Sequence, residues 1–135
     1  MYATTQHALA GTKLQHGRAL VLTGRQGCGK GTLARIIAAA HGRFCEISAS
    51  ELDRPHKFEP ALSGNPHVIV VEGLPETPQA VTTVKALISN RETVLRARHG
   101  KPARAIDTPH LIFCTSDPAH EFLLEQSRRL TVIHL

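Results

Sequence analysis

The residues best suited to chemistry form a glycine-rich run, Gly24-Arg25-Gln26-Gly27-Cys28-Gly29-Lys30-Gly31-Thr32. The run fits G-x-x-x-x-G-K followed by Gly31 and Thr32, one residue away from the form in which Ser or Thr follows the lysine directly. Glycines let the backbone curl so that successive N–H groups point at one anion, and a following helix adds its dipole. Lys30 can reach terminal phosphates, and a hydroxyl at the helix start can hold a magnesium ion. The run predicts a nucleoside-triphosphate site; a simple glycine-rich turn before a helix is the alternative.

Two apolar runs end in polar residues that could complete this site. Val68-Ile69-Val70-Val71 is followed by Glu72, and Leu111-Ile112-Phe113-Cys114 is followed by Thr115, Ser116 and Asp117. In open α/β sheets, ligands bind at the carboxyl ends of the strands. A carboxylate there can hold magnesium or orient an attacking water, and a hydroxyl can touch the γ-phosphate. The alternatives are an ordinary surface glutamate and a turn that closes the strand.

Basic residues gather in two later segments. Arg96, Arg98, His99 and Lys101 lie around the turn of an expected hairpin, and Arg104 lies on its second strand. A basic hairpin tip suits contact with a phosphate backbone without sequence readout. The alternative is a solvated hairpin whose charges prevent edge aggregation. The pair Arg128-Arg129 precedes the last apolar run, and one of the two could act as an arginine finger on a neighbouring subunit's nucleotide.

Hydrophobic periodicity supplies the elements that must position these residues. We expect strands at 18–23, 43–48, 67–71, 111–115 and 130–135, and helices at 30–41, 78–90 and 119–126. Residues 3–16 are mildly helical, residues 50–62 form at most a broken helix because of Pro55 and Pro60, and residues 93–98 and 103–106 form a hairpin. Since strands alternate with helices, the predicted fold is α/β, with a mainly parallel sheet, helices on both faces and an inserted β-hairpin.

Composition narrows the function classes. The length of 135 residues and the 41% share of hydrophobic residues suit one domain with a modest core. The formal charge of +5 indicates either a polyanionic partner or a basic solvated face. Aromatic residues make up only 4%, so a base-stacking platform is not expected. The three cysteines form no C-x-x-C pair, and neither a zinc-site spacing nor a G-x-S-x-G motif is present. With no long apolar run, we expect a soluble, cytoplasmic protein.

The order of these motifs resembles the ATPase core of superfamily 3 helicases, within the AAA+ group of P-loop ATPases, and especially the phage and plasmid primase-helicase type. The resemblance covers roughly residues 17–135. Its landmarks are the phosphate loop, the strand ending in Glu72, the stretch Val84-Lys85-Ala86-Leu87-Ile88-Ser89, the basic hairpin, the strand leading to Pro118, and Arg128-Arg129. It implies a three-layer P-loop fold and one ATPase domain over 1–135, with an N-terminal helical segment at 1–16 and the ATPase core at 17–135.

The resemblance also implies roles for particular residues. Lys30 and Thr32 would bind phosphate and Mg²⁺, Glu72 would be the Walker B acid and a second metal ligand, and Ser116 would be the sensor. Arg128 or Arg129 would be the finger, and the hairpin tip would face single-stranded or forked DNA in the channel of a homo-oligomeric ring such as a hexamer. Two departures are visible, because Gly73 follows Glu72 where many members have a second acid, and Ser116 replaces the usual sensor Asn. ATP would contact Gly24, Gln26, Gly27, Cys28, Gly29, Lys30, Gly31, Thr32 and Leu33.

The predicted function is therefore an ATP-hydrolysing motor core that acts on DNA in phage or plasmid replication. Two other classes stay open. The spacing of the glycine-rich run is also that of adenylate kinases and related nucleotide kinases, although no arginine-lined lid segment is apparent. A regulatory AAA+ module that binds ATP without unwinding DNA is the third. Phosphate transfer to a nucleoside monophosphate, DNA-stimulated hydrolysis, and binding without turnover would distinguish the three.

Overall fold

The computed structural model describes residues 14, 17–97, 100 and 102–135, and at residues 55–57 it describes the backbone alone. The helical segment expected at 3–16 lies outside this range apart from Leu14. The same is true of Arg98, His99 and Lys101 in the expected hairpin turn.

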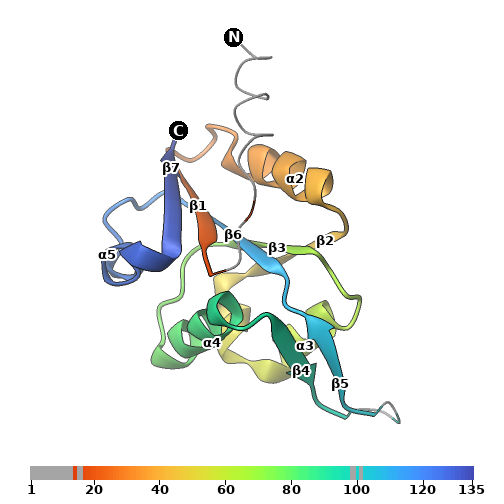
Figure 1. The fold of residues 1–135 in the computed structure, drawn as a ribbon. Coiled ribbons are helices and arrows are strands. Elements are labelled where there is room, and N and C mark those ends of the chain that lie inside the picture. The colour runs from red at the N-terminus through yellow and green to blue at the C-terminus, as the bar shows by residue number, and fades with distance from the viewer. Residues whose placement is uncertain (1–13, 15–16, 98–99, 101) are drawn as a thin grey trace.

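A five-stranded parallel sheet forms the centre of the fold, with strand order β2-β3-β6-β1-β7 (Figure 1). Its strands are β1 (Ala19–Thr23), β2 (Phe44–Ser48), β3 (Val68–Glu72), β6 (His110–Thr115) and β7 (Leu130–His134). β6 lies between β1 and β3, because Ile112 pairs with Leu20 on one side and with Val70 on the other. Every residue of β1 is buried, as expected for a central parallel strand covered on both faces.

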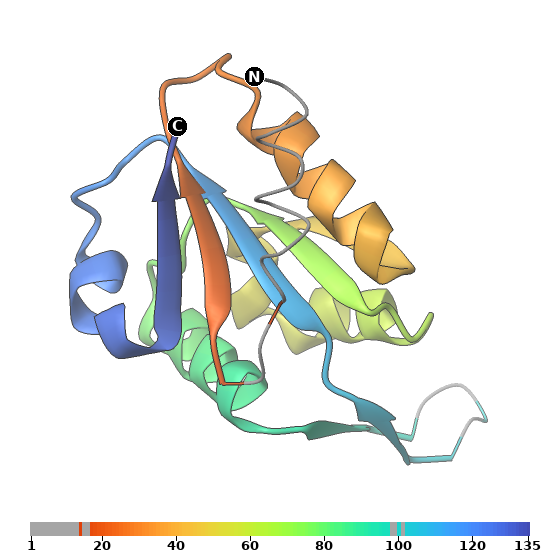
Figure 2. The ribbon, with the colours of Figure 1, turned by 45° about the horizontal axis from the view of Figure 1, so that its top comes forward.

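Helices cover both faces of the sheet, which confirms the predicted three-layer α/β fold (Figure 2). α2 (Lys30–His41) packs on one face through Ala34, Ile37 and Ala38. The other face is covered by α3 (Pro55–Leu62), α4 (Pro78–Ser89), α5 (Glu121–Glu125) and the 3₁₀ turn η1 (Ala49–Asp53). A second 3₁₀ turn, η2 (Ser127–Arg129), leads into β7.

The helices agree with the periodicity to different degrees. α4 buries Ala80, Val84, Leu87 and Ile88, the face that the pattern predicts, and the Thr77 hydroxyl caps it by accepting a hydrogen bond from the Ala80 N–H at 3.1 Å. The spacing of Leu33, Ile36, Ile37 and Ala40 predicts one apolar face for α2, and this prediction was wrong in part. Ile36 is 45% exposed and Ala40 is exposed, whereas Ala34 and Ala38 are buried. Small side chains at these two positions allow the helix to approach the sheet closely.

The remaining differences concern proline and strand ends. The region 50–62 forms η1 and α3, with Pro55 in the first helical turn, where its missing N–H has no cost, and Pro60 inside the helix. The hairpin strands are β4 (Glu92–Leu95) and β5 (Arg104–Asp107), so β4 ends before Arg96. α5 begins at Glu121 because His120 caps it.

The hairpin and the glycine-rich loop lie at opposite ends of the sheet (Figure 2). β5 runs into the amino end of β6, whereas the loop follows the carboxyl end of β1. Thr93 and Thr108 join the base of the hairpin through a hydroxyl–hydroxyl hydrogen bond of 2.7 Å. Within the described part of the chain, no helix has the length and apolar character needed to cross a membrane.

Candidate functional site

The glycine-rich loop presents unpaired backbone N–H groups at the start of α2. The first helical bond joins the Leu33 N–H to the Gly29 carbonyl at 2.9 Å, so the N–H groups of Lys30, Gly31 and Thr32 have no helical acceptor. No side chain caps this end, and the first turn contains no acidic residue. The helix therefore directs three N–H groups and its dipole toward a site that suits an anion.

Gly27 and Gly29 set the path of this loop. Their φ angles are 85° and 94°, in the left-handed region that favours glycine. A Cβ at either position would have no atom within 4 Å, so backbone conformation rather than crowding selects glycine there. The space beside the loop backbone is consequently open on the side where the side chains would project.

Gly24 is required for a different reason, which is close packing. A Cβ at this position would lie 2.7 Å from the Cys28 sulfur and 3.2 Å from the Leu135 Cβ. The Gly24 N–H also donates to the Thr115 carbonyl at 3.3 Å, which ties the loop to the end of β6. The start of the loop is thus fixed against the carboxyl ends of the neighbouring strands.

Lys30 folds back under the loop. Its side chain is only 8% exposed, and its Nζ donates to the carbonyls of Gly24 at 2.9 Å and Arg25 at 3.0 Å. No carboxylate forms an ion pair with it among the residues that the structure describes. Since an ammonium group has three protons, one donor remains after these two bonds. A buried positive charge without a counter-charge favours an anion in the loop.

Glu72 is the exposed last residue of β3, and its backbone pairs with Cys114 of β6. Two strand spacings, about 9.6 Å, separate β3 from β1, with β6 between them. The Gly73 N–H donates to the Cys114 carbonyl at 2.8 Å, and the φ of Gly73 is 93°. The chain therefore turns directly after Glu72, at the same edge of the sheet as the glycine-rich loop.

The buried thiol of Cys114 lies within the electrostatic reach of both groups. Burial, followed by the charge of Glu72, raises its pKa from 9.0 to about 11, while Lys30 acts in the opposite direction. Its sulfur lies 3.9 Å from the Lys30 carbonyl oxygen. The thiol is thus packed against the start of α2 and is influenced by the charge at the end of β3.

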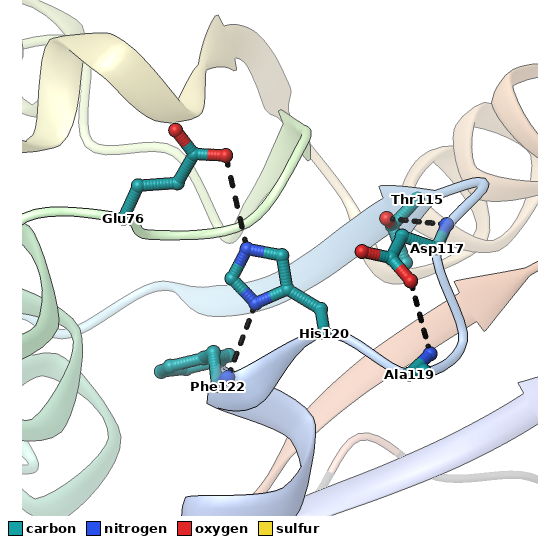
Figure 3. Close-up of polar contacts among 6 residues, drawn as sticks. All are labelled: Glu76, Thr115, Asp117, Ala119, His120 and Phe122. Carbon is teal, nitrogen blue, oxygen red and sulfur yellow. Dashed lines mark hydrogen bonds and ion pairs between the residues drawn. The ribbon is translucent and has the colours of Figure 1, made fainter.

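The polar residues on either side of Ser116, Thr115 and Asp117, accept hydrogen bonds within a turn (Figure 3). The Thr115 hydroxyl accepts from the Asp117 N–H, and the Asp117 carboxylate accepts from the Ala119 N–H, both at 3.1 Å. These are the turns that the sequence left open as an alternative for this segment. Ser116 itself is exposed and carries no side-chain hydrogen bond within the described residues.

His120 and Glu76 join this turn to the loop after β3, a link that the sequence did not reveal. The His120 ring accepts from the Phe122 N–H at 3.1 Å through Nδ1, and its Nε2 lies 3.8 Å from a Glu76 carboxylate oxygen (Figure 3). Histidine is not among the preferred helix N-caps. No local signal therefore marks His120 as the residue that caps α5.

The structure does not bring Arg128 and Arg129 to the glycine-rich loop. Both belong to η2, and the next residue, Leu130, pairs with Ala19 at the amino end of β1. The length of β1, about 16 Å, separates that end from the loop. The Arg129 guanidinium donates to the Ser89 hydroxyl at 3.0 Å, while Arg128 is exposed.

Of the hairpin residues expected to bind nucleic acid, only Arg96 is described. Its side chain is 76% exposed, and its Nε lies 3.4 Å from a carboxylate oxygen of Glu59 in α3. The Glu59 side chain is only 17% exposed, so the accessible part of this pair is the Arg96 guanidinium.

Comparison with solved structures relates the fold to larger proteins. The apo A form of the NrS-1 C-terminal region matches with a TM-score of 0.62 and 21% identity, covering 87% of this chain and 29% of that chain. NtrX from Brucella abortus in complex with ATP matches with a TM-score of 0.60 and 16% identity, covering 98% of this chain and 36% of that one. The chain thus spans about a third of each protein, and similarities at this identity describe the fold alone.

Comparison by sequence identifies a family but no curated relative. No curated protein shows significant sequence similarity to the chain. One family model, described as "Family of unknown function (DUF5906)", matches residues 22–129.

Proposed function

We propose that this chain, which belongs to the Family of unknown function (DUF5906), binds and hydrolyses ATP. It would do so as a AAA+, superfamily 3 helicase-like motor core that acts on DNA. The coarser part of this function, a P-loop-like fold related to nucleotide binding, agrees with both solved structures described above. Hydrolysis, magnesium and DNA are the finer parts of the proposal.

The arrangement of Lys30 and the α2 N-terminus is the observation that carries the proposal. Three unpaired N–H groups, a buried ammonium with one remaining donor, and the absence of acids in the first helical turn all favour a polyphosphate. Each charge-assisted hydrogen bond contributes about 1.5–3 kcal/mol, so several of them acting together give strong binding. NtrX, whose crystal contains ATP, supports ATP as the nucleotide.

Thr32 and Glu72 are the proposed magnesium ligands. Both are exposed, one in the first turn of α2 and the other at the end of β3. Magnesium often takes only one or two protein ligands beside phosphate oxygens and water, so these two residues would be enough to hold it. Bound there, the ion would neutralise phosphate charge.

Glu72 and Ser116 are proposed to act on the attacking water and the γ-phosphate. β6 lies between β1 and β3, so Ser116 follows the strand that separates the loop from Glu72. The Thr115 hydroxyl and one Asp117 carboxylate oxygen accept turn hydrogen bonds, whereas the exposed Ser116 hydroxyl has no hydrogen-bond partner among the described residues. A carboxylate that orients water and a hydroxyl that contacts phosphate are the groups that hydrolysis requires.

The two arginines of η2 support a motor that works as an oligomer. Their position at the amino end of the sheet is too distant for contact with their own loop, so a catalytic arginine there would have to serve a neighbouring subunit. The hairpin, at the same end of the sheet, would bind DNA through its basic residues.

The test is the ATPase rate with and without single-stranded DNA, on protein whose oligomeric state is measured in the same buffer. DNA-stimulated hydrolysis by an oligomer is the expected result. ATP binding without turnover would instead favour a regulatory module, and phosphate transfer to a nucleoside monophosphate would favour a nucleotide kinase.

A further inference from the structure

A groove at the amino end of the sheet is basic and takes no part in the proposed ATP site. It encloses about 830 Å³ between the carboxyl end of α2, the loop joining α3 to β3, and the base of the hairpin. Its cationic and imidazole side chains are those of Arg43, Arg91, Arg104, His41, His67 and His110. The glycine-rich loop precedes the other end of α2, about 18 Å away along the helix. The two sites are therefore separate.

Two arginines of this groove, Arg43 and Arg104, each donate to a backbone carbonyl of the loop that joins α3 to β3. Arg104 Nη2 donates to the Ser63 carbonyl at 2.6 Å, and Arg43 Nη2 donates to the Asn65 carbonyl at 3.1 Å. Since these acceptors are two residues apart, they lie within about 7 Å of each other. Neither guanidinium has an ion pair in the described part of the chain. Each guanidinium therefore has no directly paired carboxylate among the described residues, and its remaining N–H donors are available to an anion.

Glu92 and Asp107 also line the groove, but they do not neutralise Arg104. They pair directly across the hairpin, and Arg104 pairs with Leu95. Because successive residues of a strand point to opposite faces, positions 92 and 95 lie on different faces. The side chains of Glu92 and Asp107 therefore lie across from each other on one face of the hairpin, and the Arg104 side chain lies on the opposite face.

The wall that holds the arginines has a defined backbone. The Arg43 N–H donates to His67 Nδ1 at 3.1 Å, so the neutral ring carries its proton on Nε2 as a further donor. A Cβ at Gly42 would lie 2.5 Å from that Nδ1, so glycine is needed for the ring to pack there. Asn65 adopts a positive φ of 52°, which asparagine tolerates better than most residues. Although Arg43 and Arg104 are exposed, the carbonyls that anchor their side chains belong to a defined backbone segment.

We propose that this groove binds the phosphate backbone of a single-stranded nucleic acid that passes along the hairpin. Guanidinium groups match phosphate oxygens in a planar, two-donor geometry. Among the groove's described lining residues the only aromatic rings are the imidazoles of His41, His67 and His110, and two of these, His41 and His110, contact each other. With no Phe, Tyr or Trp beside them in the described lining, the three arginines make contact with the backbone the favoured mode. The hairpin supplies one wall of the groove, which makes the groove continuous with the segment proposed to contact DNA. The inference rests on the nucleic-acid part of the proposed function and is independent of ATP hydrolysis.

The experiment measures binding of a fluorescein-labelled oligothymidylate to the full chain over a salt series, without nucleotide. The double variant Arg43→Gln, Arg104→Gln should lose about tenfold or more in affinity at low salt. The slope of log K against log salt should fall in magnitude by about 1.4, because each phosphate contact of a single strand contributes about 0.7. A matched control, Arg54→Gln with Lys85→Gln, removes two exposed cations outside the groove and should change both quantities much less.

Equal losses in the two double variants would overturn the proposal, because binding would then depend on net charge alone. Inorganic triphosphate that competes with the oligonucleotide in the wild type, and itself binds tightly only when Arg43 and Arg104 are present, would identify a free-phosphate site and also overturn it. A second measurement needs no substitution. Oligothymidylate should protect Arg43 and Arg104, but not Arg54, from phenylglyoxal in the wild-type protein, and absence of this protection would contradict the proposal.

Lys30→Ala separates this inference from the proposed ATPase. If the groove is right, this variant binds oligothymidylate like the wild type even though its nucleotide site is impaired. A wild-type protein that hydrolyses ATP but binds no oligonucleotide would overturn the groove and leave the ATP site standing. A protein that binds oligonucleotide through Arg43 and Arg104 but never hydrolyses ATP would support the groove and contradict the ATPase.

Discussion

The two ends of the parallel sheet offer an anion different chemistry. At the carboxyl end, the binding groups are mainly backbone N–H groups of Lys30, Gly31 and Thr32, with one buried ammonium beneath them. At the amino end, they are guanidinium and imidazole groups that project into an open groove. Fixed backbone dipoles select a phosphate in one position, whereas exposed cations attract any phosphate chain and are screened by salt. The difference suits a nucleotide at one end and a polymer at the other.

The arginines of η2 give the largest expected effect and test whether the two ends work together between subunits. Replacing both Arg128 and Arg129 with Ala should lower turnover by about 10³-fold or more while ATP affinity stays nearly intact, because a finger acts on the transition state. The single variants sharpen this. Arg128→Ala should account for most of the loss, since Arg129 is bonded to Ser89 within its own subunit. Steady-state ATPase kinetics at several protein concentrations measure both.

The contrary result for this pair is equally clear. A strictly monomeric protein whose rate is independent of concentration and of both arginines would exclude a ring in which one subunit completes its neighbour's site.

Glu72→Gln tests whether the carboxyl end is catalytic or only binds. The amide keeps the shape and removes the charge, so ATP binding should persist while hydrolysis falls by about 10²–10⁴-fold. Glu76→Gln is a matched control, because Glu76 is an exposed acid on the loop that follows the same strand. Equal turnover in wild type and Glu72→Gln would assign the catalytic acid elsewhere, with Asp117 the next candidate.

The hairpin turn tests the amino end on its own. Neutralising His99 and Lys101 should weaken single-stranded DNA binding about equally for all sequences. It should also flatten the salt dependence of binding by about 0.7 for each phosphate that the variant no longer binds. Anisotropy titrations with oligonucleotides of different sequence measure this. A weakening confined to one sequence would indicate base readout instead of backbone contact.

Cys114 gives the smallest expected effect and reports on the carboxyl end. Because burial and Glu72 raise its pKa from 9.0 to about 11, the folded state holds the thiol proton more tightly than the unfolded state. Its contribution to stability should be complete below pH 9 and be lost as the pH rises through 11. Urea unfolding of wild type and Cys114→Ala should show their difference shrinking over this interval, and parallel curves would contradict the raised pKa.

The two ends also differ in how well the sequence predicts them. Gly24–Thr32 are contiguous, and their glycines act through local backbone geometry, so the loop could be recognised directly. The bounds of α2 and the buried face of α4 followed from hydrophobic periodicity, which each continuous segment contains in itself. The exposed Ile36 did not, because close approach of Ala34 and Ala38 to the sheet is a tertiary effect.

The amino end could not be predicted in the same way. Its groove combines Arg43, His67 and Arg104, which only the strand order and the α3–β3 loop bring together. The contact between His120 and Glu76 likewise joins two loops that follow different strands. Where a site depends on side chains from distant segments, residue spacing along the chain contains little information about it.

Calorimetric titration of ATP with Mg²⁺ into the wild type and Lys30→Ala tests the central claim most directly. Lys30 lies beneath the loop and is the only charged residue that is buried among the described residues. Its remaining donor is proposed to bind phosphate. The wild type should bind ATP, and the variant should bind at least about tenfold more weakly, given about 1.5–3 kcal/mol for one charge-assisted hydrogen bond. Its oligothymidylate affinity should stay unchanged. Equal ATP affinity in the two proteins would contradict a nucleotide site at the carboxyl end of the sheet.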